Sequence, residues 1–134
     1  MTMHKTETLT IQSSTDVVLV RQMVRQFAVE IGFGLVDQTK IVTAASELAR
    51  NTLDYGGGGT VQLESLQAGG RVGLRLTFED QGPGIPDVEM AMKDGFTTGG
   101  GLGMGLGGAK RLSNDFAIES VVGKGTRVII VRWK

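Results

Sequence analysis

Glycine placement constrains the folding of this chain more than any other feature of its sequence. Eight glycines fall between residues 95 and 108, and four more stand side by side at residues 56–59. In total 21 of the 134 residues are glycine, about twice the average usage. Because glycine has no Cβ, it permits left-handed backbone and close contacts that other residues forbid. Two regions of the backbone are therefore freed from side-chain restriction.

Length and charge exclude several classes of function. A chain of 134 residues with 40% hydrophobic composition fits one domain, which we expect to span residues 1–134 with a flexible tail at 1–7. Basic and acidic residues number 14 each, so no net positive field attracts nucleic acid or a membrane surface. There is no cysteine and no apolar run of the ~18 residues that span a bilayer. We expect a cytoplasmic protein without nucleic-acid or membrane partners.

Four helices are predicted from the spacing of apolar residues. Apolar side chains recur at three- and four-residue steps over residues 17–31, and Gly32 offers a left-handed stop. Asp37 is a suitable cap for a second helix that ends near residue 55. Shorter helices are expected over residues 88–93 and from about residue 105.

Strands are predicted in the remaining segments. Alternation of apolar and polar residues indicates a first strand around residues 9–11, and a hairpin of residues 61–64 and 72–78. Two closing strands, 116–122 and 126–133, flank a glycine-containing turn. Because strands cluster late and helices are interspersed, we predict an α+β fold. It would be a two-layer sandwich with a mixed, mostly antiparallel sheet covered by helices on one face.

Asp80 is the first candidate for a functional residue. Even-numbered residues of the strand at 72–78 are apolar and face the core, and Asp80 continues that parity. A buried carboxylate needs hydrogen-bond donors, from the protein or from a ligand. Gly82 and Gly84 follow in an Asp-x-Gly-x-Gly motif and let the backbone approach a flat ligand. If the strand ends at Glu79, the same residues form an ordinary turn.

Glu47 and Asn51 form the second candidate pair. They stand four residues apart on a predicted helix, so both side chains project from one face. A carboxylate can accept the proton of an attacking hydroxyl, and an amide oxygen suits Mg²⁺ that is held mainly by phosphates and waters. A solvated helix face explains the same pair without any chemistry.

The glycine-rich segment at residues 99–106 is the third candidate. It leads directly into a predicted helix, whose first backbone N–H groups are unpaired and point back toward the glycines. Such groups, together with the positive end of the helix dipole, bind anions such as a triphosphate. The segment lacks the Gly-Lys-Ser/Thr ending of a P-loop, and a flexible loop explains it equally well when it is taken alone.

Taken in order, these motifs resemble those of the GHKL group, the Bergerat-fold ATPases and kinases that include gyrase, Hsp90, histidine kinases and anti-sigma-factor kinases. The resemblance spans residues 17–133. Residues 46–51 are similar to the N box, 80–84 to the G1 box, 101–106 to the G2 box and 123–126 to the final box. The short length and the Glu-Leu-Ala-Arg-Asn motif at residues 47–51 are most similar to those of the RsbT-type switch kinases of the stressosome.

The resemblance implies a site for ATP and Mg²⁺. It implies that Asp80 accepts a hydrogen bond from the adenine amino group, helped by a water and the Thr126 hydroxyl. Asn51 would hold Mg²⁺, the glycine-rich segment would hold the phosphates, and Glu47 would be the catalytic base. The implied ATP-binding residues are Asn51, Asp80, Gly82, Gly84, Gly101, Leu102, Gly103, Met104, Gly105, Leu106 and Thr126.

The resemblance also implies a serine/threonine protein kinase that phosphorylates STAS-domain proteins and, once released from them, activates a PP2C-type phosphatase regulator. The alternative is a nucleotide-gated module that grips a sigma factor with little kinase activity. Retention of Glu47 favours the kinase, because a pure binder needs no base. A complete histidine kinase would need a phosphoacceptor histidine on a helical hairpin, whereas His4 is the only histidine and lies in the expected tail.

Overall fold

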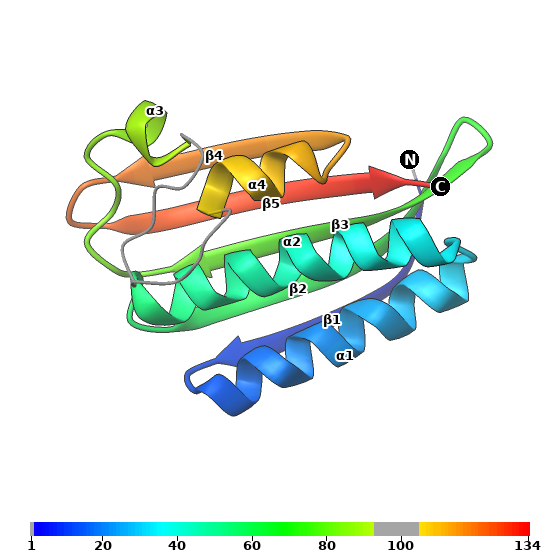
Figure 1. Cartoon of the computed structure of the whole chain (residues 1–134), viewed down its shortest axis with the longest axis horizontal. Coiled ribbons are helices and arrows are strands. Elements are labelled where there is room, and N and C mark those ends of the chain that lie inside the picture. The colour runs from blue at the N-terminus through cyan, green and yellow to red at the C-terminus, as the bar shows by residue number, and fades with distance from the viewer. Residues whose placement is uncertain (1, 93–104) are drawn as a thin grey trace.

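The computed structural model describes residues 2–92 and 105–134. Within them, a five-stranded sheet forms one layer and helices cover one of its faces (Figure 1). The elements in chain order are β1 (Thr2–Ile11), α1 (Ser14–Ile31), α2 (Leu35–Asp54), β2 (Gly59–Ala68), β3 (Arg71–Asp80), α3 (Val88–Ala91), α4 (Gly105–Arg111), β4 (Asp115–Val121) and β5 (Gly125–Trp133). The predicted α+β class and the one-sided cover of helices are confirmed.

The sheet has the strand order β1-β2-β3-β5-β4, and each neighbouring pair is antiparallel. The predicted predominance of antiparallel pairing is confirmed, and only the expectation of some parallel pairing is wrong within the described residues. β4 runs in the same direction as β3, but β5 is inserted between the two, so no parallel pairing forms between them. The short turn between β4 and β5 imposes their antiparallel pairing, and β5 then completes the ladder with β3.

The long helix α1 follows the predicted pattern. The Ser13 side chain accepts a hydrogen bond from the backbone N–H of Asp16 and caps the first turn, and Gly32 ends the helix with a φ of 96°. Its inner stripe includes Val20 and Phe27, which are buried against the sheet and α2. No helix within the described parts of the chain is both long and apolar enough to cross a membrane.

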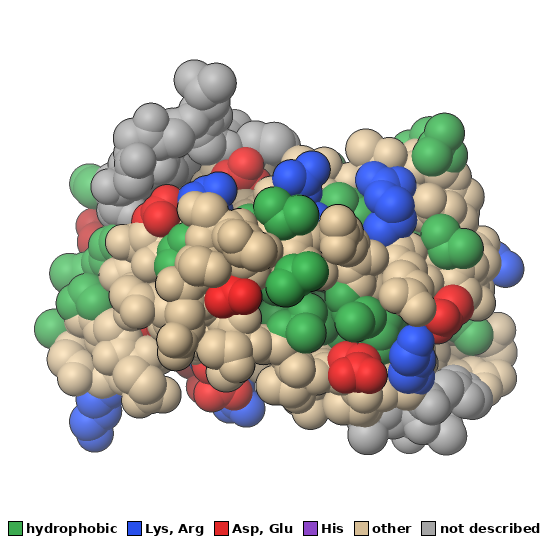
Figure 2. All heavy atoms as spheres, turned by 90° about the horizontal axis from the view of Figure 1, so that it is seen from below, with side chains coloured by type: hydrophobic (Ala, Val, Ile, Leu, Met, Phe, Trp, Pro, Cys, Tyr) green, Lys and Arg blue, Asp and Glu red, His purple; other side chains and the backbone are tan. Residues whose placement is uncertain are grey.

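The outer side of α1 carries apolar as well as polar side chains. Val18, Leu19 and Val29 are each about half exposed. In Figure 2, which views the molecule from below Figure 1, hydrophobic side chains gather in the middle of the surface among charged ones. The outer surface of this helix is therefore less polar than a fully solvated amphipathic helix.

The N-terminal segment is a strand, so the predicted flexible tail over residues 1–7 is wrong for residues 2–7. β1 pairs with β2 from Thr2 opposite Gln67 to Ile11 opposite Gly59. The Lys5 ammonium lies 2.9 Å from the Glu30 carboxylate. This hydrogen bond and the positive charge lower the pKa of Glu30. The polar sequence of the segment concealed its backbone pairing, because an edge strand tolerates polar side chains.

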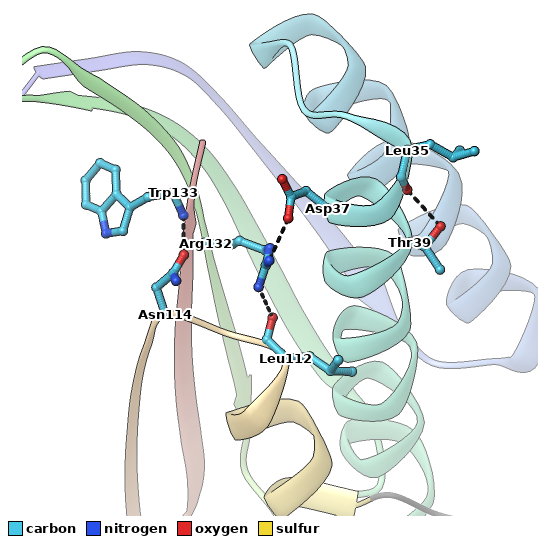
Figure 3. Close-up of polar contacts among 7 residues, drawn as sticks. All are labelled: Leu35, Asp37, Thr39, Leu112, Asn114, Arg132 and Trp133. Carbon is cyan, nitrogen blue, oxygen red and sulfur yellow. Dashed lines mark hydrogen bonds and ion pairs between the residues drawn. The ribbon is translucent and has the colours of Figure 1, made fainter.

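Arg132 on β5 connects the sheet to two helices (Figure 3). Its guanidinium donates to the Asp37 carboxylate at 2.6 Å and to the Leu112 carbonyl at 2.9 Å. Asp37 was predicted to cap α2, but the helix begins at Leu35, with Gly34 at the N-cap position, and Asp37 lies in its first turn. The prediction failed because the carboxylate has a charged partner from β5, which the local sequence does not reveal.

We predict that Arg132→Met lowers the free energy of unfolding by about 2 kcal/mol, because the Asp37 carboxylate and the Leu112 carbonyl both lose a charged donor. Chemical denaturation measures this loss. Lys110→Met is the matched control, since Lys110 is exposed on α4 and the change removes the same charge. We expect the control to stay within about 0.5 kcal/mol of the parent. Equal losses in the two variants would contradict the role given to Arg132.

Candidate functional site

β3 carries Asp80 to the end of the covered face of the sheet. Leu74, Leu76 and Phe78 alternate along the strand and are buried in the core, and the strand continues through Asp80. Asp80 is opposite Gly59 on β2 and Thr126 on β5. The strand therefore does not stop at Glu79, and the inward parity of Asp80 is the one that the sequence predicts.

Asp80 lines a cavity of about 170 Å³. The walls come from α2, the ends of β3 and β5, the segment from Ile85 to Ala91, and α4. Its polar lining residues are Asn51, Thr52, Tyr55, Asp80, Asp87 and Thr126. Much of the remaining lining is apolar, including Leu48, Phe78 and Leu106. An apolar cavity with a few placed polar groups is typical of a small-molecule site and suits a flat heteroaromatic ring.

Three glycines lie at the corner around Asp80, where a larger side chain would not fit. A Cβ on Gly56 would lie 2.4 Å from the Asp80 Cγ, and a Cβ on Gly82 would lie 2.7 Å from the Gly56 Cα. Gly125 has a φ of 124°, and a Cβ there would meet the Asp80 carbonyl oxygen at 2.1 Å. The close backbone approach at this corner therefore requires glycine at each of the three positions.

One oxygen of the Asp80 carboxylate is held by the protein. The backbone N–H of Gly82 donates to Oδ1 at 2.9 Å. Among the described residues, no hydrogen bond to Oδ2 is present. Because the side chain lines the cavity, this second oxygen can accept an N–H from a ligand there. The site thus offers a fixed acceptor at the end of an apolar slot.

The helix α2 positions Asn51 and Glu47 differently. Asn51 lines the cavity, and among the described residues its side-chain amide has no hydrogen-bond partner. Glu47 lies one turn earlier on the same helix and is partly exposed, outside the lining formed by the described residues. No cluster of three or more His, Cys, Asp or Glu side chains suited to a metal occurs in the described residues. Asn51 fits Mg²⁺ that takes its other ligands from phosphates and waters.

The predicted phosphate segment is described only in part. Gly101, Leu102, Gly103 and Met104 lie outside the described residues. Gly105 begins α4 with a φ of 58°, and Leu106 lines the cavity.

Gly82 and Gly84 shape the turn beside Asp80 and are absent from the lining that the described residues form. Gly84 has a φ of 78°, and its carbonyl accepts a hydrogen bond from the Tyr55 hydroxyl at 2.7 Å. Their contribution to the site is therefore the path of the backbone rather than a side-chain contact.

Residues 36–134 match the family described as histidine kinase-, DNA gyrase B-, and HSP90-like ATPase. The chain belongs to this ATPase family. It is 50% identical over 123 residues to the serine/threonine-protein kinase RsbT of Bacillus subtilis, with 92% of both chains covered. It is 32% identical over 117 residues to the anti-sigma F factor of Geobacillus kaustophilus, covering 82% of this chain and 79% of that protein. The resemblance inferred from the motifs is confirmed.

Two solved structures share the fold. The structure of the RsbU and RsbW domains of a Mycobacterium tuberculosis protein superposes with a TM-score of 0.67 at 20% identity. The match covers 98% of this chain and 33% of that one, so this chain spans about a third of its length. The mycobacterial sensor histidine kinase MprB superposes with a TM-score of 0.57 at 22% identity, over 96% and 97% of the two chains.

Three residues in or beside the site of this ATPase-family domain were not predicted from the sequence. Gly56 belongs to the glycine run at residues 56–59, but the sequence did not indicate that it packs against Asp80. Tyr55 lies four residues after Asn51, so the helical spacing that selected Asn51 also indicates Tyr55. Ser120 continues the inward parity of Phe116 and Ile118 on β4 as a polar residue, which is the same signal that selected Asp80.

We predict that Gly56→Ala destabilises the fold by about 1–3 kcal/mol, because the new methyl group must displace the Asp80 carboxyl group. Gly34→Ala is the matched control, since a Cβ there has no atom within 4 Å and the residue has a negative φ. We expect the control to change stability by about 0.5 kcal/mol or less. Thermal unfolding of both variants measures the difference, and similar stabilities would rule out the close contact at Gly56.

Proposed function

We propose that this chain is a cytoplasmic ATP-dependent serine/threonine protein kinase and partner-switching regulator. It phosphorylates STAS-domain proteins and, when released from them, activates a PP2C-type phosphatase regulator. The observation that carries the proposal is the Asp80 Oδ2, which has no hydrogen-bond partner among the described residues and lies at a cavity shared with Asn51 and Thr126. Similarity to the serine/threonine-protein kinase RsbT at 50% identity supports the kinase activity.

Adenine occupies the apolar cavity in this proposal. Its exocyclic amino group donates to Asp80 Oδ2, while Phe78 and Leu106 contribute apolar walls beside the ring. A guanine base presents a carbonyl at the same ring position, and two acceptors facing each other repel. The fixed acceptor therefore selects ATP over GTP.

Asn51 and the glycine-rich segment at residues 101–106 bind the polar end of the nucleotide. The Asn51 amide oxygen is a ligand for Mg²⁺, which neutralises phosphate charge when it is bound. The backbone N–H groups of residues 101–106 donate to the phosphates. Placement of Asn51 on the cavity wall, one turn from Tyr55, supports the first assignment.

Glu47 is the proposed base for phosphoryl transfer. Its carboxylate accepts the proton of the partner's serine or threonine hydroxyl, while the hydroxyl oxygen bonds to the γ-phosphorus. The bond from that phosphorus to the oxygen of the β-phosphate breaks, and ADP leaves. Glu47 lies one turn from Asn51 and is partly exposed, outside the cavity wall that the described residues form. This position is consistent with contact to a protein substrate.

A second function is a nucleotide-gated binding module that holds a sigma factor or a similar regulator and transfers little phosphate. The 32% identity to an anti-sigma F factor favours it. Incubation with labelled ATP, Mg²⁺ and a STAS-domain protein separates the two functions. Label on the STAS-domain protein supports the kinase, and binding without transfer supports the module.

We predict that Asp80→Asn weakens ATP binding by about 10- to 100-fold, because the amide presents a donor or a poorer acceptor to the adenine amino group. Isothermal titration calorimetry with Mg²⁺ and ATP measures the change. The control is Glu79→Gln, the same chemical change at the exposed neighbouring position. An affinity of Asp80→Asn for ATP equal to that of the parent would show that Asp80 does not bind the adenine amino group.

We predict that Glu47→Gln leaves ATP affinity within about twofold of the parent and slows phosphotransfer to a STAS-domain acceptor by about 10²- to 10⁴-fold. The side chain keeps its size, so only the proton acceptor is lost. Glu119→Gln, an exposed position on β4, serves as the control with parent-like transfer. Unchanged transfer in Glu47→Gln would exclude Glu47 as the base.

A further inference from the structure

Ser120 lies behind the cavity wall and touches two segments that form it. It stands on β4, opposite Thr126 of β5, and is partly buried. Ser120 itself is absent from the lining formed by the described residues, whereas both Ile85 and Thr126 belong to it. The function proposed above assigns no role to Ser120.

The hydrogen bonds of the Ser120 hydroxyl leave two acceptors for its proton. Its oxygen accepts from the backbone N–H of Ile85 at 2.7 Å. The same oxygen lies 2.9 Å from the Thr126 hydroxyl and 3.3 Å from the Gly125 carbonyl. A hydroxyl has a single proton, so Ser120 donates either to Thr126 or to Gly125. The shorter distance favours donation to Thr126, because O–H···O hydrogen bonds are strongest near 2.7–2.8 Å.

Donation from Ser120 leaves the Thr126 proton available to the cavity. Thr126 is also the register partner of Asp80 across β3 and β5. The cavity therefore presents an acceptor, Asp80 Oδ2, and beside it a donor, the Thr126 hydroxyl. This order matches the adenine edge, which has an amino donor next to the N1 acceptor. Guanine and hypoxanthine carry the opposite order, a carbonyl acceptor next to an N1–H donor.

We propose that Ser120 is a positioning and specificity-determining residue that orients the Thr126 hydroxyl as a donor toward N1 of adenine, directly or through a water. This inference rests on the proposed ATP site. Ser120 acts through Thr126 and does not contact the base. Its bond to the Ile85 N–H holds the neighbouring wall, but that contact alone would affect all nucleotides equally.

The test compares ATP with 1-deaza-ATP, in which a C–H group replaces N1. Calorimetry with Mg²⁺ gives both affinities for the parent, Ser120→Ala, Ser120→Thr and Thr126→Val. We expect the parent to bind ATP about 5- to 10-fold more tightly than 1-deaza-ATP. Ser120→Ala and Thr126→Val should each reduce the ratio of ATP affinity to 1-deaza-ATP affinity to about 2 or less. Ser120→Thr keeps the hydroxyl and should retain the parental ratio.

The ratio separates positioning from simple structural support. If Ser120→Ala weakens both nucleotides by the same factor and keeps the ratio, the inference is wrong. A parent that binds ATP without preferring it to 1-deaza-ATP overturns the inference but leaves the ATP site intact. A parent that binds neither nucleotide overturns the proposed function as well.

Two further variants keep the test decisive. Where circular dichroism shows that Ser120→Ala is unfolded, Ser120→Cys replaces it, because a thiol has a similar shape and is a weak donor. It should lower the ratio in the same way, and a parental ratio in Ser120→Cys counts against the inference. In a Thr126→Val background, adding the Ser120→Ala change should leave the ratio unaltered, since the hydroxyl that Ser120 orients is already gone.

Discussion

The Asp80 carboxylate is the constraint on which the rest of the site depends. A partly buried charge is stable only where donors meet it, and among the described residues one donor, the Gly82 N–H, reaches a single oxygen. Gly56, Gly82 and Gly125 bring three stretches of backbone against the residue. The second oxygen has no donor within the part of the chain that the structure describes, so a ligand in the cavity can supply one. Packing at this corner and ligand specificity therefore depend on the same residue.

The fold supports that corner from a distance. Antiparallel pairing of β5 with β3 places Thr126 opposite Asp80, and α2 brings Asn51 and Tyr55 to the same cavity. At the other end of these elements, Arg132 joins β5 to α2 and to the residue that follows α4. Since α4 also contributes Leu106 to the cavity, the same helix is anchored at one end and in contact with the site at the other.

Local patterns predicted much of this structure. Helical spacing identified α1, period-two alternation identified β3, and continuation of that alternation oriented Asp80. Contacts between residues distant in sequence were not predictable. The position of β5 between β3 and β4 appears only in the folded chain. The same holds for Arg132, the partner of the Asp37 carboxylate. The same parity that selected Asp80 also applies to Ser120, but a neutral hydroxyl costs less to bury than a charge and so does not by itself indicate a site.

The central claim is that Asp80 faces the amino group of a bound adenine. A crystal structure with Mg²⁺ and a non-hydrolysable ATP analogue tests it most directly. We expect the adenine ring in the cavity between α2 and β3, with its amino nitrogen about 3 Å from the Asp80 carboxylate. An adenine base bound elsewhere, for example in the hollow beside Lys5 and Phe27 at the other end of the sheet, would contradict the role proposed for Asp80.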